Sequence, residues 1–413
     1  GVDADGAVTF ADGRYLIRKF EPPLPGFEAD GLALPSSDGL EVYEFDRSGR
    51  HLRTRDGLTG AVVRTFEYDA AKRLTGVVDA FGKRTRIERN GAGVATAIIA
   101  PGGQRTALTI NGDGYLELLE NPAGEEHRFG YHGEGLLAGY KRPEGGTTRF
   151  DYDSTGRLIR HRGADGEERT LHREETERGP RVTIRTAGGR ETVYSMEVLP
   201  NGDRRRTVQT PAGAKTTSTV RVDGITELVA EDGTKTTVEA APDPRWGAAV
   251  PIMAEQVTTT PDGKSVRIRR ADTVTLSDPR NPFSVTQLRR TFTEGENEIS
   301  TWTYRSSDRT ITTRSAENRE TVTTLDAHGR VVKQTLGTGV APLEYTYDEL
   351  GRPKSIKQGA EATTFAYDAK HRLTSSTDAG GHAVTYTYDD ADRVKTRTLP
   401  GNRTYTYGYD RNG

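Results

Sequence analysis

The sequence contains no cysteine. Disulfide bonds and thiol chemistry are therefore excluded, and cysteine usage leaves the redox compartment open. No apolar stretch approaches the roughly 18 residues that a membrane-spanning helix needs. The net charge is only −2, from 58 basic and 60 acidic residues, which provides no basic footprint for nucleic acid or an anionic membrane. We therefore predict no nucleic-acid partner and no membrane insertion by this chain.

Hydrophobic residues are also scarce, at 33% of 413 residues, whereas an ordinary soluble domain is about 45–50% apolar when glycine is included. A solid core for a chain of this length would need more of them. Disorder is the usual consequence of such a deficit, but disordered chains lack aromatic and β-branched residues. Here Tyr, Thr and Val recur in register. The composition therefore predicts a thin ordered wall, one sheet thick.

What the sequence does contain is a repeat built on the dipeptide Tyr-Asp. Six copies occur, and the last four follow one another at intervals of 20, 21 and 21 residues. The tyrosines are Tyr68, Tyr152, Tyr347, Tyr367, Tyr388 and Tyr409. A fixed period of this length indicates one supersecondary unit that is used again and again.

Each unit reads as a β-hairpin. In residues 383–388 Val and Tyr alternate with Ala and Thr, which is the period of a strand. Residues 389–392 then form a turn, residues 393–397 return as a second strand, and the unit has no room for a helix. We predict an all-β fold in which repetitive β-hairpins form a long spiral sheet that wraps into a hollow shell, partial or open in this fragment.

The parts of the repeat have separate physical roles, shown by residues 152–158. Asp153 can accept hydrogen bonds from backbone N–H groups two residues on, and Gly156 can take the positive φ that a short hairpin loop needs. Arg157 is placed to pair with a carboxylate or to cover a tyrosine ring. The predicted structural repeat residues are Tyr68, Asp69, Arg73, Tyr152, Asp153, Gly156, Arg157, Tyr347, Asp348, Gly351, Arg352, Tyr367, Asp368, Arg372, Tyr388, Asp389, Arg393, Tyr409 and Asp410. Lys72, His371 and Asp392 stand where other copies have glycine.

The spacing of the repeats divides the chain into four segments. Residues 1–40 are a lead-in or plug-like segment, residues 41–170 carry repeats, residues 171–320 are divergent hairpins of the same sheet, and residues 321–413 carry repeats again. The sequence stops within a repeat after Tyr409, which predicts that it is a fragment truncated mid-repeat. The proline-rich stretch 242–244 predicts an interruption of the strands.

No pattern in the sequence predicts chemistry. The eight histidines lack metal-ligand spacing, and no Gly-x-Ser-x-Gly elbow occurs. We predict no catalytic residue, no cofactor and no metal. The arginine run 204–206 could suggest a polyanion site, but alternation sends neighbouring residues to opposite faces of a strand, which favours a solvated face. The tyrosines could stack on sugars, although packing within the wall accounts for them better.

The motif Tyr-Asp-x-x-Gly-Arg-Leu resembles the repeat of the YD-repeat (Rhs-repeat) family, most closely at residues 152–158 and 347–352. This family includes bacterial Rhs polymorphic toxins, the cocoon-forming subunits of insecticidal toxin complexes and the teneurin shell. The resemblance implies a strip of β-sheet wound into a hollow shell, on a protein that is secreted or at the cell surface. In toxin members the shell encloses a cytotoxic C-terminal segment released by self-cleavage. The self-cleavage motif is absent from these residues.

The function that we expect is therefore a non-enzymatic shell segment that encapsulates its own C-terminal polypeptide cargo, a toxin encoded downstream of this fragment. A different class of function is adhesion, in which the outer face binds a cell-surface protein or a glycan. A third is a carbohydrate-binding β-sheet that uses the tyrosines.

Overall fold

The computed structural model describes residues 8–12, 16–20, 27–28 and 31–410. Parts of the predicted lead-in segment, and the last three residues of the final repeat, therefore lie outside the described residues. Within these ranges every regular element is a strand. That part of the chain includes no helix with the length and apolar character to cross a bilayer.

The strands follow one another closely along the chain. The first group is β1 (Val8–Asp12), β2 (Leu16–Phe20), β3 (Phe27–Glu28), β4 (Gly31–Pro35), β5 (Glu41–Asp46), β6 (His51–Asp56), β7 (Val62–Tyr68), β8 (Leu74–Asp79), β9 (Arg84–Arg89), β10 (Ala95–Ile99), β11 (Arg105–Ile110), β12 (Leu116–Glu120), β13 (Glu126–Tyr131), β14 (Leu137–Lys141), β15 (Thr147–Tyr152) and β16 (Leu158–Arg162). The second is β17 (Glu168–Thr176), β18 (Gly179–Thr186), β19 (Glu191–Val198), β20 (Arg204–Gln209), β21 (Lys215–Val220), β22 (Thr226–Val229), β23 (Lys235–Asp243), β24 (Gly247–Thr259), β25 (Ser265–Leu276), β26 (Val285–Glu294) and β27 (Asn297–Arg305). The third is β28 (Thr310–Ser315), β29 (Glu320–Leu325), β30 (Val331–Thr335), β31 (Leu343–Tyr347), β32 (Pro353–Gln358), β33 (Glu361–Tyr367), β34 (Leu373–Thr377), β35 (Ala383–Tyr388), β36 (Val394–Leu399) and β37 (Arg403–Thr406).

The topology is that of one continuous ribbon. β1 pairs with β2 in a separate hairpin. From β3 onward each strand pairs antiparallel with the next one in sequence, through to β37. No backbone ladder joins β37 to β3 in the described part of the chain, so the sheet is an open strip. This all-β strip of sequential hairpins is the fold that the repeat predicts.

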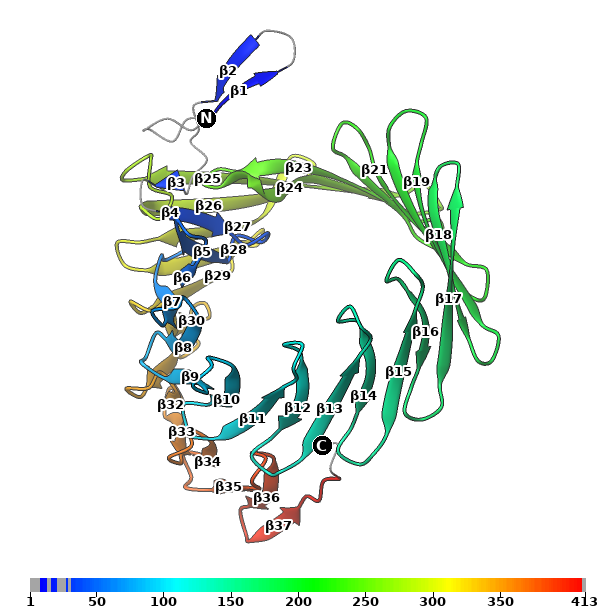
Figure 1. Cartoon of the computed structure of the whole chain (residues 1–413). Coiled ribbons are helices and arrows are strands. Elements are labelled where there is room, and N and C mark those ends of the chain that lie inside the picture. The colour runs from blue at the N-terminus through cyan, green and yellow to red at the C-terminus, as the bar shows by residue number, and fades with distance from the viewer. Residues whose placement is uncertain (1–7, 13–15, 21–26, 29–30, 411–413) are drawn as a thin grey trace.

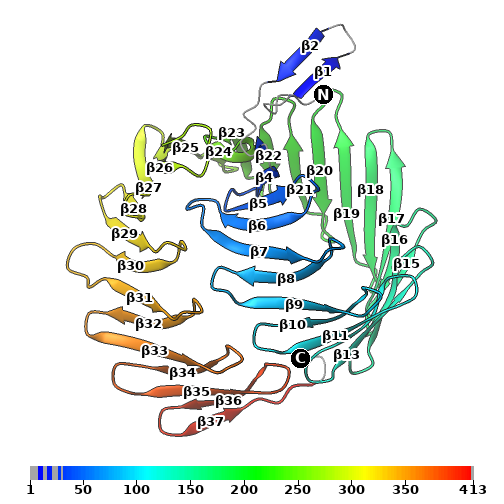
Figure 2. The same cartoon turned by 60° about the vertical axis from the view of Figure 1, so that its left-hand side comes forward.

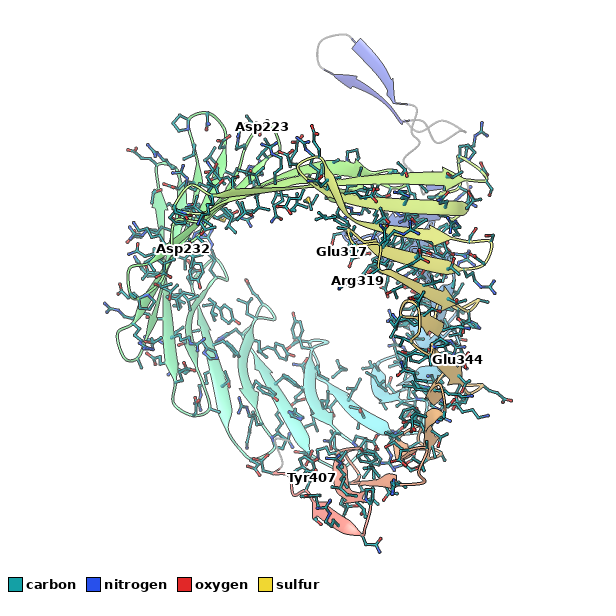
Figure 3. All side chains as sticks on the ribbon, turned by 180° about the vertical axis from the view of Figure 1, so that it is seen from behind. Asp223, Asp232, Glu317, Arg319, Glu344 and Tyr407 are labelled. Carbon is teal, nitrogen blue, oxygen red and sulfur yellow. The ribbon has the colours of Figure 1, made fainter. Side chains whose placement is uncertain are left out.

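The strip curls through a wide ring (Figures 1 and 2). Its late strands β33 to β36 come to lie beside β10 to β13. With side chains drawn, the centre of the curl stays open (Figure 3). The accessible surface supports a thin wall, because it measures 25405 Å², whereas a compact protein of 45.2 kDa would expose about 15,800 Å². Right-handed strand twist, added from one hairpin to the next, is the physical source of such coiling.

The sheet continues without a break through residues 171–320, where no Tyr-Asp dipeptide occurs. Its pairing is continuous from β17 to β29, and the strand texture of residues 204–209 becomes β20. The predicted interruption at residues 242–244 is wrong in part, since Pro242 lies within β23 and stands opposite Pro251 of β24. The ladder register shifts immediately after Pro242, an irregularity that tolerates a residue without an N–H group.

Of the ten buried hydrophobic residues in the described part of the chain, seven gather at two places instead of along a central core. One cluster joins Val42 of β5 to Trp246 and Val250. The other is formed by Val285, Leu288, Tyr304 and Leu325, with Leu58 packed against it. In both clusters residues from the first hairpins of the strip meet residues roughly 200 to 270 positions later in the chain. Most buried hydrophobic residues therefore lie where two separate parts of the sheet contact each other.

Candidate functional site: the tyrosine ladder and the seam

The repeat turn is fixed by its aspartate. Between β31 and β32, Asp348 Oδ1 accepts the backbone N–H groups of Leu350 and Arg352 at 3.0 and 2.8 Å. The Gly351 N–H donates to the Asp348 carbonyl at 3.0 Å, and Gly351 has φ of 76°. A residue with positive φ followed by a register shift is the geometry of a short hairpin loop closed by a bulge. The aspartate therefore replaces the backbone partners that the turn itself cannot supply.

The other copies show the same arrangement. The aspartate Oδ1 accepts the N–H of the arginine four residues on at 2.8–3.0 Å in Asp69, Asp153, Asp348, Asp368 and Asp389. The arginine Nε donates to the other carboxylate oxygen at 2.7–2.8 Å in Arg73, Arg352, Arg372 and Arg393. Arg157 differs, because only its backbone N–H is bonded to Asp153 among the described residues. Lys72, His371 and Asp392 adopt φ of 63°, 68° and 64° at the glycine position.

The tyrosine of each repeat connects it to the hairpin before. The Tyr388 hydroxyl donates to the Leu373 carbonyl at 2.7 Å, and the Arg372 guanidinium carbon lies 4.6 Å from the Tyr388 ring centre. The hydroxyl bond is repeated at 2.8–3.0 Å by Tyr68, Tyr152, Tyr347, Tyr367 and Tyr409. The arginine contact is repeated at 4.1–4.7 Å on Tyr347, Tyr367 and Tyr409. Aspartate, arginine and tyrosine thus form a ladder from hairpin to hairpin, which we call the tyrosine ladder.

The ladder shifts the ionisation of its members. Burial opposes the charged form of Asp348, Asp368 and Asp389, but hydrogen bonds from the arginine of the same turn outweigh burial and lower the pKa of each carboxyl. Burial raises the pKa of Tyr367 and Tyr388. At neutral pH the aspartates are therefore firmly ionised and the tyrosines are protonated donors.

The wall meets itself along a line that we call the seam. Its dry end is built by the turn between β23 and β24. There Arg245 Nη1 donates to the Gly57 carbonyl at 2.6 Å, and the Trp246 ring, 1% exposed, packs against Phe283 with ring centres 5.5 Å apart. Val42 of β5 packs against the same indole. A turn from the middle of the strip thus covers its first hairpins.

Further along, the seam continues as a row of side-chain contacts. Phe81, in the turn after β8, lies 4.8 Å from the His328 ring and under the Arg330 guanidinium at 4.3 Å. The next contacts place Gln104 Nε2 at 3.5 Å from the Lys370 carbonyl and Arg393 Nη2 at 3.2 Å from Glu125 Oε1. The early partners follow one another at roughly one repeat, whereas the late partners are separated by about two repeats and then one. Turns of the early hairpins therefore dock on the aspartate turns of the late ones, through side chains instead of a backbone ladder.

The sequence brought the ladder residues to notice but not the seam residues. Arg245, Trp246, Phe81, Gln104 and Glu125 carry no shared motif. The turns that carry some of them recur at the repeat spacing, but this spacing does not show which residue each one contacts across the seam.

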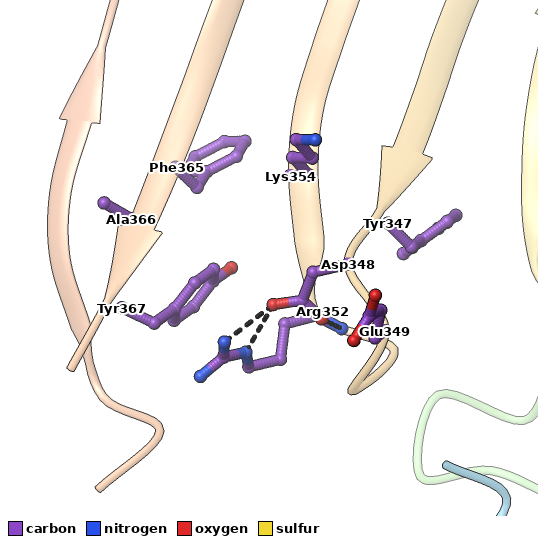
Figure 4. Close-up of a pocket in the computed structure, with 8 residues that line it drawn as sticks. All are labelled: Tyr347, Asp348, Glu349, Arg352, Lys354, Phe365, Ala366 and Tyr367. Atoms are coloured by element: carbon purple, nitrogen blue, oxygen red, sulfur yellow. Dashed lines mark hydrogen bonds and ion pairs between the residues drawn. The ribbon is translucent and has the colours of Figure 1, made fainter. Parts of the chain in front are cut away.

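A shallow pocket lies on the ladder between β31 and β33 (Figure 4). It is lined by Tyr347, Asp348, Glu349, Arg352, Lys354, Phe365, Ala366 and Tyr367. Its Asp348 and Arg352 are already paired with each other at 2.7 Å. In the described ranges no group of three or more His, Asp or Glu residues is arranged to hold a metal ion. The polar interactions at this pocket are those that hold neighbouring hairpins together.

A strip of sequential hairpins, tied by a side-chain ladder and docked on itself along a seam, defines a repeat protein of the β-shell class. The comparison with protein families agrees, since residues 29–413 match the teneurin YD-shell family. The chain therefore belongs to the teneurin YD-shell family and is a shell-type scaffold.

Other comparisons add little to this assignment. No curated protein matches the chain. Among solved structures it is similar to the Tc holotoxin pore of Photorhabdus luminescens, at 14% identity and TM-score 0.48 over 89% of this chain and 22% of that one. It is similar to TcdB2-TccC3 without its hypervariable C-terminal region, at 14% identity and TM-score 0.48 over 97% of this chain and 26% of that one. The chain thus spans about a quarter of these chains, and at such scores the likeness carries no argument.

Proposed function

We propose that this shell segment is non-enzymatic and encloses a polypeptide cargo, the C-terminal segment of its own protein. The observation that carries the proposal is the seam: the strip does not remain an extended ribbon but curls until its turns dock on its own earlier hairpins. Side chains leave the centre of the curl open (Figure 3). Membership in a shell family supports the same role. A secreted or cell-surface location accords with this function.

The mechanism we propose is physical. A wall of continuous antiparallel ladders has no unpaired strand edge between its ends, so the wall itself offers a guest chain few free backbone groups. A guest held inside is kept from proteases and from its target until the wall opens. The glycan-binding alternative gains no support, because the ladder tyrosines donate to backbone carbonyls and carry arginine on their rings.

Protease protection tests this function. A guest segment with a protease site is expressed downstream of the complete shell, and its cleavage is followed over time beside the same guest alone. Enclosure predicts cleavage at least tenfold slower inside the shell, and faster again when the seam is loosened by Trp246→Ala. Rapid digestion within an intact shell would count against enclosure.

A further inference from the structure

One face of the strands β19 to β22 exposes five apolar side chains, three of them at alternate positions of β19. In the ladder register Tyr194 stands opposite Val208, Met196 opposite Arg206 and Val198 opposite Arg204. On the other side of β20, Val220 stands opposite Arg204, and beyond it Leu228 stands opposite Ser218. We call this surface the β19–β22 patch, defined by Tyr194, Met196, Val198, Arg204, Arg206, Val220 and Leu228.

The apolar side chains of the patch are exposed to solvent. Its five apolar side chains are between 42% and 58% exposed. Exposed apolar residues are ordinarily scattered singly, and contiguous ones mark sites of interaction. The patch thus has the character of a surface that binds something.

The charge of the patch identifies the chemistry of its partner. Arg204 and Arg206 are exposed, and neither forms an ion pair with any described residue. Several other strand arginines are paired with a carboxylate, such as Arg185 with Glu191 at 2.7 Å. No Asp or Glu occupies the same face of β19 to β22. The nearest carboxylate along the chain, Asp203, already accepts the Val222 N–H at 3.0 Å and pairs with Asn201. Two positive charges therefore remain uncompensated within an apolar surface.

The spacing of these two charges matches that of an extended polypeptide. Arg204 and Arg206 are two residues apart on one strand, so their Cα atoms are separated by roughly 6.6 Å. Alternate side chains of an extended segment point the same way with the same interval. Two carboxylates at positions i and i+2 could each take a bidentate bond from one guanidinium. A segment that runs along β20 in this way would place its next side chain on the same side over Val208 and Tyr194, which stand opposite each other. Met196, Val198 and Val220 lie beside the two arginines on the neighbouring strands, where they would flank the bound segment.

We propose that the β19–β22 patch binds an extended polypeptide segment that carries two carboxylates two residues apart, flanked on the same side by apolar side chains. A second copy of the patch is a poor partner, because face-to-face pairing would set arginine against arginine. The site does not depend on enclosure: its residues are remote from the seam contacts, so loss of guest protection and loss of peptide binding are separate observations.

The test uses the whole chain and a fluorescein-labelled peptide with the order Val-Thr-Glu-Thr-Glu-Thr-Phe. Fluorescence anisotropy should show saturable binding that weakens at least tenfold in the double variant Arg204→Gln and Arg206→Gln. Met196→Ser should weaken it several-fold. The matched control is Arg205→Gln, on the opposite face of the same strand, which should stay within twofold of the parent. Circular dichroism checks that each variant keeps its strands.

Four results would overturn the proposal. They are an absence of saturable binding, equal binding by the double glutamine variant, equal binding of a peptide with Lys in place of Glu, and self-association of the chain that the double variant abolishes. Binding to phosphatidylglycerol vesicles that the peptide cannot displace would assign the patch to a lipid surface and also overturn it. Displacement from such vesicles by the peptide supports the proposal.

Discussion

Arg393 reaches the Glu125 carboxylate at 3.2 Å from the other side of the seam. The same guanidinium donates to Asp389 within its own turn at 2.8 Å, and its carbon lies 4.7 Å from the Tyr409 ring centre. A single arginine therefore links a hairpin turn, the tyrosine ladder and the docking of one part of the wall on another.

Glu125→Gln should loosen the seam locally and leave the hairpins intact. The pair is partly exposed, so the cost should be below about 1 kcal/mol. Hydrogen exchange should rise in the turn 121–125 and in the turn 389–393, while exchange elsewhere stays unchanged. Glu126→Gln is the matched control, because Glu126 pairs with Arg128 on the open surface. Equal responses of the two variants would contradict a role for the seam.

Tyr388→Phe should destabilise the hairpins β33 to β36. It removes the hydroxyl bond to the Leu373 carbonyl and leaves that group with one partner fewer, at a cost of about 0.5–1.5 kcal/mol. The ring and its arginine contact remain. Denaturant unfolding measures the change. Tyr405→Phe should have no effect, since the Tyr405 side chain is 51% exposed and its hydroxyl bonds no described residue.

The aspartate turns predict how stability depends on pH. The pKa of Asp348, Asp368 and Asp389 is lowered in the folded protein from the ordinary value of 3.8. Their contribution is therefore complete above that value and is lost as the pH falls through the lower folded values. Thermal stability should be flat above about pH 5 and fall below about pH 4. A triple Asp→Asn variant at these positions should lose stability at neutral pH and show a shallower acid decline; an unchanged acid profile would refute the assignment.

Gly351→Ala should disturb the seam as well as the turn. The glycine has φ of +76°, and an added Cβ would clash with the Phe81 ring. The backbone strain alone should cost about 1 kcal/mol. Gly145→Ala isolates this strain, since Gly145 has φ of +89° with open space around the new Cβ.

A double-mutant cycle separates the steric clash from the strain. If Phe81 is the obstacle, Gly351→Ala should cost less in a Phe81→Ala background than in the parent protein. Strictly additive free energies of unfolding would show that the two residues do not meet.

Trp246→Ala should be the most damaging single substitution along the seam. It empties a buried site shared by Val42, Val250 and Phe283, and truncations of buried aromatic residues cost about 3–5 kcal/mol. Met196→Ala, on the exposed patch, should change stability little. Limited proteolysis should cut the first hairpins of the Trp246 variant faster, and resistance equal to the parent would argue that the cluster does not hold the wall closed.

The contrast between ladder and seam explains what the sequence could predict. The turn at Asp348 is determined within five residues, so its hydrogen bonds follow from local chemistry, and the repetition of that turn predicts the all-β strip. The contact of Trp246 with Val42 depends on how far each hairpin rotates from the last, summed over some twenty strands. No local pattern encodes that sum. The stretch 242–244 shows the same limit, since its prolines predict an interruption, whereas β23 runs on through Asp243 to present Arg245 and Trp246 to the first hairpins.

Among the described residues no backbone ladder crosses the seam, and this has a mechanical consequence. Peeling one hairpin from the next must break a row of main-chain hydrogen bonds together, whereas parting the seam breaks only individual side-chain contacts such as those of Phe81 and Glu125. The sheet therefore resists separation of neighbouring hairpins, whereas the seam can open by loss of a few side-chain contacts. Substitutions at a few turn positions would set the force or acidity at which it opens, without redesign of a single strand.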